Sequence, residues 1–170
     1  MHAWCGRCWH SAPVRPAKYP DPDNQTLAAV ELMVGHPLGG QEIRALINEV
    51  AARLDPMGPR HSVVIVGGSL LAWHGLRQTT EDVDSVRHLG AELRRAVASV
   101  ASDHGLSPSG LNVNAASLIP ATFDPRECEV FLDHPRLLVL GAPLRDVFVM
   151  KIYRGSPNDL DGMVAMWPRT

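Results

Sequence analysis

The stretch VVIVGGSLLAWHGLRQTTEDVDSV, residues 63–86, decides the fold of this chain. Its β-branched beginning predicts a buried strand over 62–66, because such runs bounded by turn signals are typical of strands. The small residues Gly67-Gly68-Ser69 then predict a tight turn directly into a helix over 70–75. A second strand is expected over 83–86, so the stretch predicts a strand–helix–strand unit.

Two carboxylates and the glycine turn give this unit its chemical character. Asp82 and Asp84 occupy alternate positions, so a strand would point them to the same side of a sheet. Paired carboxylates are ligands that Mg²⁺ accepts together with substrate phosphates. A glycine turn that opens a helix can hold a phosphate, although it can also serve only as a turn, and acids at a strand end can simply be solvated. Together the two features indicate nucleotide chemistry.

The rest of the chain completes an α/β (α+β) fold, a small mixed β-sheet flanked by helices. A single domain is expected over 26–170, after an irregular proline-rich tail over 1–25. Apolar periodicity and turn signals predict helices over 26–34, 41–54, 90–104, 108–119 and 144–154, a further helix beginning at 156, and a hairpin of strands over 127–132 and 137–140.

The composition bounds the function only loosely. With 45% apolar and 20% charged residues among 170, the chain is typical of a globular protein. A net charge of −2 gives no overall attraction to nucleic acid, so any such contact needs a local basic patch. No apolar run approaches the roughly 20 residues that span a bilayer, and the N-terminus lacks the apolar core of a secretory signal. A cytoplasmic protein without membrane contact is expected.

The cysteines predict neither a disulfide framework nor a clear metal site. Cys5, Cys8 and Cys128 are too few and odd in number for a scaffold. His2 and His10 flank the first two, but structural zinc sites usually join two separated ligand pairs. A leader with free thiols is the favoured interpretation.

Two blocks of motifs resemble a known family. Gly67-Gly68-Ser69, Arg77-x-Thr79-Thr80 and Asp82-x-Asp84 resemble the signature of the nucleotidyltransferase (polymerase β-like) superfamily. More narrowly, the chain is similar to the AbiEii and MenT-like toxins of toxin–antitoxin systems, because Lys151, Arg154 and Asp159-Leu160-Asp161 resemble their later block. The resemblance extends from Val63 to Asp161.

The resemblance implies roles for individual residues. It assigns nucleotide binding to Gly67, Gly68, Ser69 and Arg77, and Mg²⁺ binding to Asp82 and Asp84. By the same resemblance Lys151 contacts a phosphate, and Asp159 either orients that lysine or accepts a proton. Simpler interpretations remain beside these: Lys151 as a solvated helix lysine, Trp73 as core, and His74 and Asp161 as surface residues.

The implied activity is Mg²⁺-dependent transfer of a nucleoside monophosphate from an NTP to an acceptor hydroxyl. The resemblance points to the 3′ end of tRNA as the acceptor, and to a toxin held by a cognate antitoxin. Local positive charge for such an acceptor would come from arginines and one lysine: Arg94, Arg95, Arg145, Arg154 and Lys151. The alternatives are nucleotidylation of a protein or small molecule, and a catalytically silent protein that binds a partner.

One feature of the superfamily has no clear counterpart in the sequence. A third carboxylate on a later strand deprotonates the attacking hydroxyl in the superfamily at large. In the strand predicted from residue 127, alternation places Glu127, Glu129 and Asp133 on one face. None of the three is singled out by its context, so the identity of the general base stays open.

Overall fold

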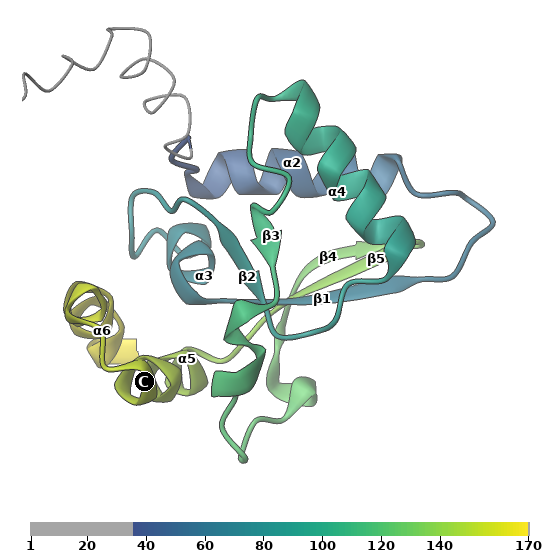
Figure 1. The fold of residues 1–170 in the computed structure, drawn as a ribbon. Coiled ribbons are helices and arrows are strands. Elements are labelled where there is room, and N and C mark those ends of the chain that lie inside the picture. The colour runs from purple at the N-terminus through teal and green to yellow at the C-terminus, as the bar shows by residue number, and fades with distance from the viewer. Residues whose placement is uncertain (1–35, 170) are drawn as a thin grey trace, which may run out of the picture. The chain divides into compact units, whose positions relative to one another are not determined.

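The structure of the protein is a computed structural model that describes residues 36–169. The predicted tail, the Cys5/Cys8 pattern and the helix predicted over 26–34 lie outside the described residues. The described helices and strands follow one another along the chain as α2 (Gly40–Ala52), β1 (His61–Val66), α3 (Gly67–Trp73), β2 (Val83–Ser85), α4 (Ala91–Asp103), β3 (Leu111–Asn112), β4 (Glu129–His134), β5 (Leu137–Gly141), α5 (Leu144–Arg154) and α6 (Leu160–Met166) (Figure 1). Short 3₁₀ helices are η1 (Asn114–Leu118), η2 (Pro125–Glu127), η3 (Pro157–Asp159) and η4 (Trp167–Arg169).

The five described strands form one mixed sheet in the order β3-β2-β1-β5-β4. Strand β1 lies at its centre, antiparallel to β2 and parallel to β5. The outer pairs are β2 with β3, which are parallel, and β5 with β4, which are antiparallel. Residues Val63–Val66 of β1 are buried on both faces, which explains their continuous apolar sequence. The predicted small mixed sheet flanked by helices is confirmed.

Helices cover the sheet on both sides. Figure 1 shows α2 and α4 on one side of the sheet and α5 with α6 on the other. The inner face of α4 is apolar at helical spacing and buries Leu93, Ala96, Val97 and Val100. On the opposite side, α5 buries Val147 and Met150 in the same core.

The prediction of a helix over 108–119 is wrong. This segment contains the two-residue strand β3 and the 3₁₀ helix η1 instead. Leu111 pairs with Val83 and Asn112 with Asp84, so hydrogen bonds to the sheet edge outweigh the local helical pattern. The helix expected from residue 156 begins as η3 and becomes α-helical only at Leu160.

An isolated β-bridge fixes the loop before β2. Leu38 and Thr80 exchange two backbone hydrogen bonds, of 2.7 and 2.9 Å, and the Thr80 hydroxyl donates to the carbonyl oxygen of Asp82 at 3.2 Å. The loop is therefore held at both Thr80 and Asp82. No helix within residues 36–169 has the length and apolar character needed to cross a lipid bilayer.

Candidate active site

The glycine turn at the end of β1 lies directly against one carboxylate. Gly67 has a φ of +67°, a conformation that costs other residues about 1–2 kcal/mol. A Cβ added at Gly67 would lie 2.8 Å from Asp84 Oδ2, and one added at Gly68 would lie 2.6 Å from Thr80 Oγ1. Both positions therefore need glycine, because the Asp84 carboxylate and the Thr80 hydroxyl approach the backbone so closely.

Ser69 and Arg77 lie on different sides of this turn. The Ser69 hydroxyl is fully buried and donates to the carbonyl oxygen of Val66 at 2.9 Å, so it ties the first turn of α3 to the end of β1. Arg77 is exposed, and its Nη1 lies 3.2 Å from where a Cβ of Gly68 would be. In this structure Arg77 is thus the cation beside the turn, whereas Ser69 supports it from within.

Asp84 lies in β2, and Asp82 directly precedes this strand, close enough to Asp84 for the two charges to interact. Asp84 pairs with Val66 of β1 on one side and with Asn112 of β3 on the other. The Asn112 side chain has a fixed orientation, because its Oδ1 accepts the backbone N–H of Asn114 at 2.9 Å. Its Nδ2 consequently faces the acids, 3.4 Å from Asp82 Oδ2.

The electrostatics of this pair favour a bound cation. Burial raises the pKa of the Asp84 carboxyl above its ordinary value, and the nearby charge of Asp82 raises it further. The charges of Arg154 and Lys151 and a hydrogen bond from Asn112 act in the opposite direction. A divalent cation between the two carboxylates would remove their mutual repulsion.

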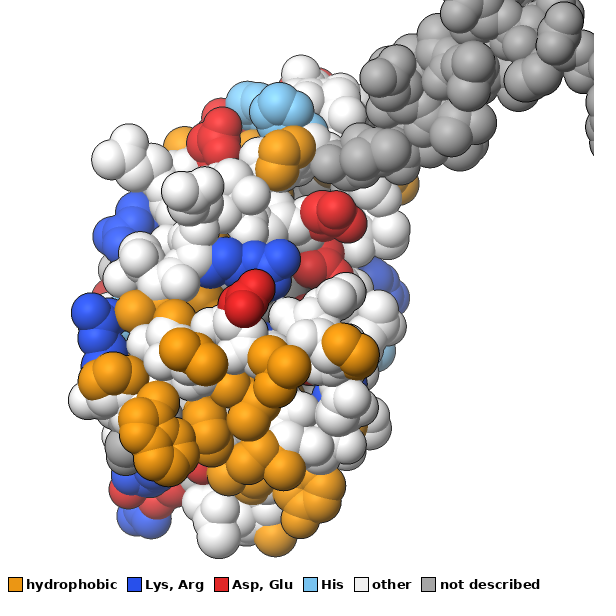
Figure 2. Space-filling model, turned by 90° about the vertical axis from the view of Figure 1, so that its left-hand side faces the viewer, with side chains coloured by type: hydrophobic (Ala, Val, Ile, Leu, Met, Phe, Trp, Pro, Cys, Tyr) orange, Lys and Arg blue, Asp and Glu red, His pale blue; other side chains and the backbone are white. Residues whose placement is uncertain are grey.

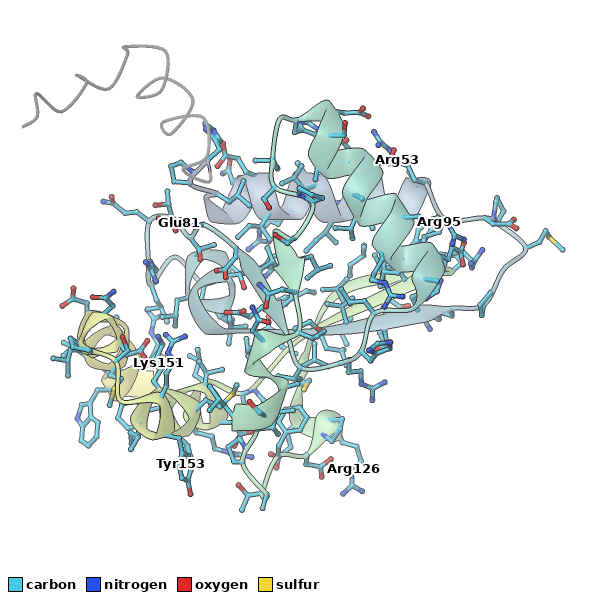
Figure 3. The ribbon with its side chains drawn as sticks, viewed as in Figure 1. Arg53, Glu81, Arg95, Arg126, Lys151 and Tyr153 are labelled. Carbon is cyan, nitrogen blue, oxygen red and sulfur yellow. The ribbon has the colours of Figure 1, made fainter. Side chains whose placement is uncertain are left out.

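A buried ion cluster lies on the α5–α6 side of these acids. The ammonium group of Lys151 donates to Asp159 Oδ1 at 2.5 Å, and Arg154 Nε donates to Asp159 Oδ2 at 2.7 Å. Lys151 and Asp159 are buried, whereas half of the Arg154 side chain is exposed. Lys151 is therefore not the solvated helix lysine of the simpler interpretation. Figure 3 shows it pointing from α5 toward the interior of the site.

Asp159 holds both cations in place. Burial alone would raise the pKa of Asp159, but hydrogen bonds from Arg154 and Lys151 outweigh it and hold this pKa below its ordinary value. Such a carboxylate is a poor proton acceptor, so its geometry fits the orienting role of the two roles proposed for it. Asp161, two residues on, is exposed.

One pocket brings both halves of the site together. Its walls include Gly67 and Asp84 from the β1–β2 side, and Lys151 and Arg154 from α5. Apolar side chains complete it: Val66, Ala115, Leu118, Val147 and Met150. Segments far apart in the sequence thus place one carboxylate of the pair, a glycine turn and two cations around one space.

The donor set fits a magnesium ion. Two carboxylates with hard oxygen atoms are present, and the described residues contain no group of three or more His, Cys, Asp or Glu side chains suited to a metal. Magnesium commonly binds one or two carboxylates and completes its shell with substrate phosphates and water. Asp82 and Asp84 would therefore hold it together with a bound nucleotide.

The structure excludes the three acids considered as a third carboxylate. Glu129 and Asp133 belong to β4, which lies at the opposite edge of the sheet from β3, and Glu127 precedes it. These acids have other partners: Glu127 pairs with Arg145, Asp133 with Arg60, and Glu129 lies 3.8 Å from His74. The predicted shared face is also wrong, because a register shift between Val130 and Leu132 puts Glu129 and Asp133 on opposite faces of β4.

Sequence reasoning missed Asn112 at this site, and it named Arg154 only in the later block and as a source of positive charge for the acceptor. Asn112 stands beside Asp84 on the neighbouring strand, but the wrong helix prediction concealed β3. Arg154 belongs to the later motif block, and only its contact with Asp159 shows that it belongs to the site. An arginine three residues after Lys151, on the same helix face, was the available signal.

Trp73 and His74 take no direct part. The Trp73 ring stacks on Phe131, with centroids 4.2 Å apart, and it packs against the core but is only half-buried, whereas a core residue was expected. His74 meets the edge of Phe131. The sequence predicted His74 to be a surface residue, but its side chain is only partly exposed.

The comparisons with known proteins agree with this geometry. No curated protein and no solved structure matches the chain. A family model described as a nucleotidyltransferase of unknown function (DUF6036) matches residues 41–166, which include the glycine turn, both aspartates and the Lys151–Asp159 block. The chain therefore belongs to this family of nucleotidyltransferases.

Proposed function

We propose that the protein transfers a nucleoside monophosphate from a Mg²⁺-bound NTP to the 3′ hydroxyl of tRNA, and that it acts as the toxin of a toxin–antitoxin pair. The observation that carries the proposal is the pocket in which Asp84 and the Gly67 turn face Lys151 and Arg154. A carboxylate pair opposite two cations suits a triphosphate that arrives with a metal ion.

Each residue has a part in this reaction. Asp82 and Asp84 would hold Mg²⁺, which when bound stabilises the negative charge on the leaving pyrophosphate. The Gly67-Gly68 turn lets the triphosphate approach the backbone, and Arg77 lies beside it as a guanidinium donor. Lys151 and Arg154 neutralise phosphate charge, and Asp159 positions both of them.

Asn112 bears on how the acceptor is activated. An amide cannot take up a proton, so the position beside Asp84 supplies no general base. Asn112 instead donates toward Asp82 and keeps the carboxylate pair aligned. The acceptor oxygen attacks the α-phosphorus while the bond to pyrophosphate breaks, and the proton of the acceptor hydroxyl passes to water.

The decisive experiment is label transfer. The purified protein is incubated with each α-³²P-labelled NTP, Mg²⁺ and total tRNA, beside an Asp82→Ala/Asp84→Ala control. Label on tRNA that disappears in the control would support the proposal and name the nucleotide. Label on protein or on a small molecule would identify that molecule as the acceptor in place of tRNA. No transfer to any acceptor would favour a catalytically silent binding protein.

The toxin role adds a partner. On the face in Figure 2, apolar side chains gather over the C-terminal helices, where Leu160 and Val164 of α6 are exposed. A protein partner such as an antitoxin would cover apolar area of this kind. Induced expression should arrest bacterial growth, and an Asp84→Asn variant made in equal amount should not.

A further inference from the structure

A second, open pocket lies at the end of α3, the helix that begins at the glycine turn. It has a volume of about 620 Å³ and is bounded by the beginning of α2, the end of α3 and the loop after α3. We call it the Arg44–Arg77 pocket. Its polar lining consists of Gln41, Arg44, Arg77 and Gln78. No acidic residue lines it, so the pocket is positively charged and unsuited to a metal ion.

Its two arginines are available for a ligand. Most of the other described arginines are paired with acids, namely Arg53, Arg60, Arg126, Arg136, Arg145 and Arg154. Within residues 36–169, neither Arg44 nor Arg77 has a carboxylate partner. Because a guanidinium presents a planar set of donors that matches a phosphate, two unpaired guanidinium groups in one pocket favour a phosphate-bearing ligand.

Arg44 is held in position by Trp73. Its Cζ lies 4.1 Å from the centroid of the Trp73 ring, and its Nη2 donates to the Trp73 carbonyl oxygen at 3.0 Å. The opposite face of Trp73 stacks on Phe131, at an interplanar angle of 11°. With both faces covered, the indole supports the guanidinium and offers no free face to a nucleobase. The pocket therefore suits a phosphate backbone, with little discrimination between bases.

The segments around the pocket are in direct contact with one another, and the pocket adjoins the glycine turn. A Cβ on Gly40 would lie 2.4 Å from the carbonyl oxygen of Ala72, so α2 begins in direct contact with α3. The bridge between Leu38 and Thr80 fixes the loop that carries Arg77. Arg77 in turn lies beside Gly68. One arginine thus belongs to both the pocket and the surroundings of the glycine turn.

We infer that the Arg44–Arg77 pocket binds the phosphodiester backbone of a polynucleotide acceptor, next to the 3′ end that receives the nucleotide. This inference rests on the proposed function and gives its acceptor a place on the structure. The basic residues that the sequence suggested for this task do not gather in one place. Figure 3 shows Arg95 of α4 and Lys151 of α5 on opposite sides of the molecule.

The test measures RNA binding without catalysis. Anisotropy of a fluorescent, unstructured 15-nucleotide RNA is titrated with the full chain at several NaCl concentrations, for wild type, Arg44→Gln, Arg44→Lys and Arg95→Gln. Arg95 is an exposed arginine of α4 and provides the matched control. Arg44→Gln should weaken binding and lower the slope of log K against log [salt] by about 0.7, the value for one phosphate contact to a single strand. Arg95→Gln should leave both unchanged.

The Arg44→Lys variant separates charge from packing. It keeps the charge but loses the planar contact with Trp73, so its slope should equal that of wild type. Equal slopes for Arg44→Gln and Arg95→Gln would overturn the inference, as would no RNA binding. Tighter binding of an acidic peptide than of RNA would also overturn it, in favour of a protein acceptor. Binding of Mg²⁺–NTP, compared between wild type and Asp82→Ala/Asp84→Ala, reports separately on the proposed function.

Discussion

Glu92 and Asp159 each bind two basic partners, and they lie near opposite ends of β1. Near the beginning of β1, Glu92 accepts from His61 Nε2 at 2.8 Å and from Arg136 at 3.3 Å, and it also accepts the backbone N–H of Asp55 at 2.9 Å. Beyond the other end, Asp159 binds Lys151 and Arg154. We call these the Glu92 cluster and the Asp159 cluster.

The surroundings of the two clusters differ, although their chemistry is alike. The Glu92 cluster joins α4, the start of β1 and the β4–β5 turn. None of its three side chains lines the pocket that contains Asp84. The Asp159 cluster shares a pocket with Asp84 and the Gly67 turn. An acidic side chain that binds two cations therefore does not by itself identify an active site. The pair of carboxylates near these cations, Asp82 and Asp84, is what distinguishes the candidate active site.

Removing one carboxylate of the Asp82–Asp84 pair should have the largest effect. Asp84→Asn should lower nucleotidyl transfer by more than about a hundredfold, because loss of residues that only support metal ligands already costs about 10–100-fold. Initial rates of label transfer measure this. Glu92→Gln is the matched control and should retain transfer per folded molecule. Equal losses in both variants would remove the functional distinction between the clusters.

The buried position of the Asp159 cluster should show in stability. Asp159→Ala leaves Lys151, 5% exposed, without its partner, and removing one member of a buried ion pair typically costs about 3–5 kcal/mol. Urea unfolding followed by circular dichroism measures the change in unfolding free energy. Glu92→Ala should cost less, because the Glu92 cluster is more accessible to water. The reverse order would contradict the burial argument.

The pH dependence of stability should identify Asp159 among the acids. The pKa of Asp159 lies below its ordinary value of 3.8, so its contribution to stability is complete above that value and is lost as the pH falls through the folded-state pKa. Unfolding free energies measured from pH 6 down to pH 2 should fall less steeply in Asp159→Asn than in wild type. An unchanged acid limb would show that Asp159 is not held ionised by its partners.

The smallest expected effect comes from comparing two glycines that have the same backbone conformation. Gly67 and Gly75 have φ values of +67° and +69°, but only at Gly67 would a Cβ meet a neighbour, the Asp84 carboxylate. Each change to alanine should cost about 1–2 kcal/mol from backbone strain. Gly67→Ala should additionally weaken Mn²⁺ binding, titrated calorimetrically in the presence of a nucleotide. Equal Mn²⁺ affinity in the two variants would separate the glycine turn from the metal site.

Local patterns predicted the parts of the fold that depend on one segment alone. The buried run before Gly67 became β1, and apolar spacing located α2, α4 and α5. The sequence could not indicate β3, because a strand of two residues exists only through its pairing with β2. The prediction of a helix over 108–119 was wrong for this reason.

The candidate site also has features that one segment predicts and features that depend on how the strands pair. Spacing alone placed Asp82 and Asp84 on one side of a strand, and the resemblance pointed to Lys151 and Asp159. The neighbours of these residues depend on strand order, which alternation does not reveal. That is why the acids of β4 were considered and Asn112 was not. The Arg44–Arg77 pocket was missed because α2 contains no motif of the family.

The parallel pairing of β1 with β5 has a consequence for how the protein folds. His61 lies opposite Leu137, so the centre of the sheet forms only when distant parts of the chain meet. Contacts of such long sequence separation slow folding, since the entropy of loop closure is lost before the contacts stabilise the sheet. Asp84 and Lys151 come together only through this closure. Nucleotide binding should therefore appear in the last phase of refolding, and a chain still lacking α5 should have no transferase activity.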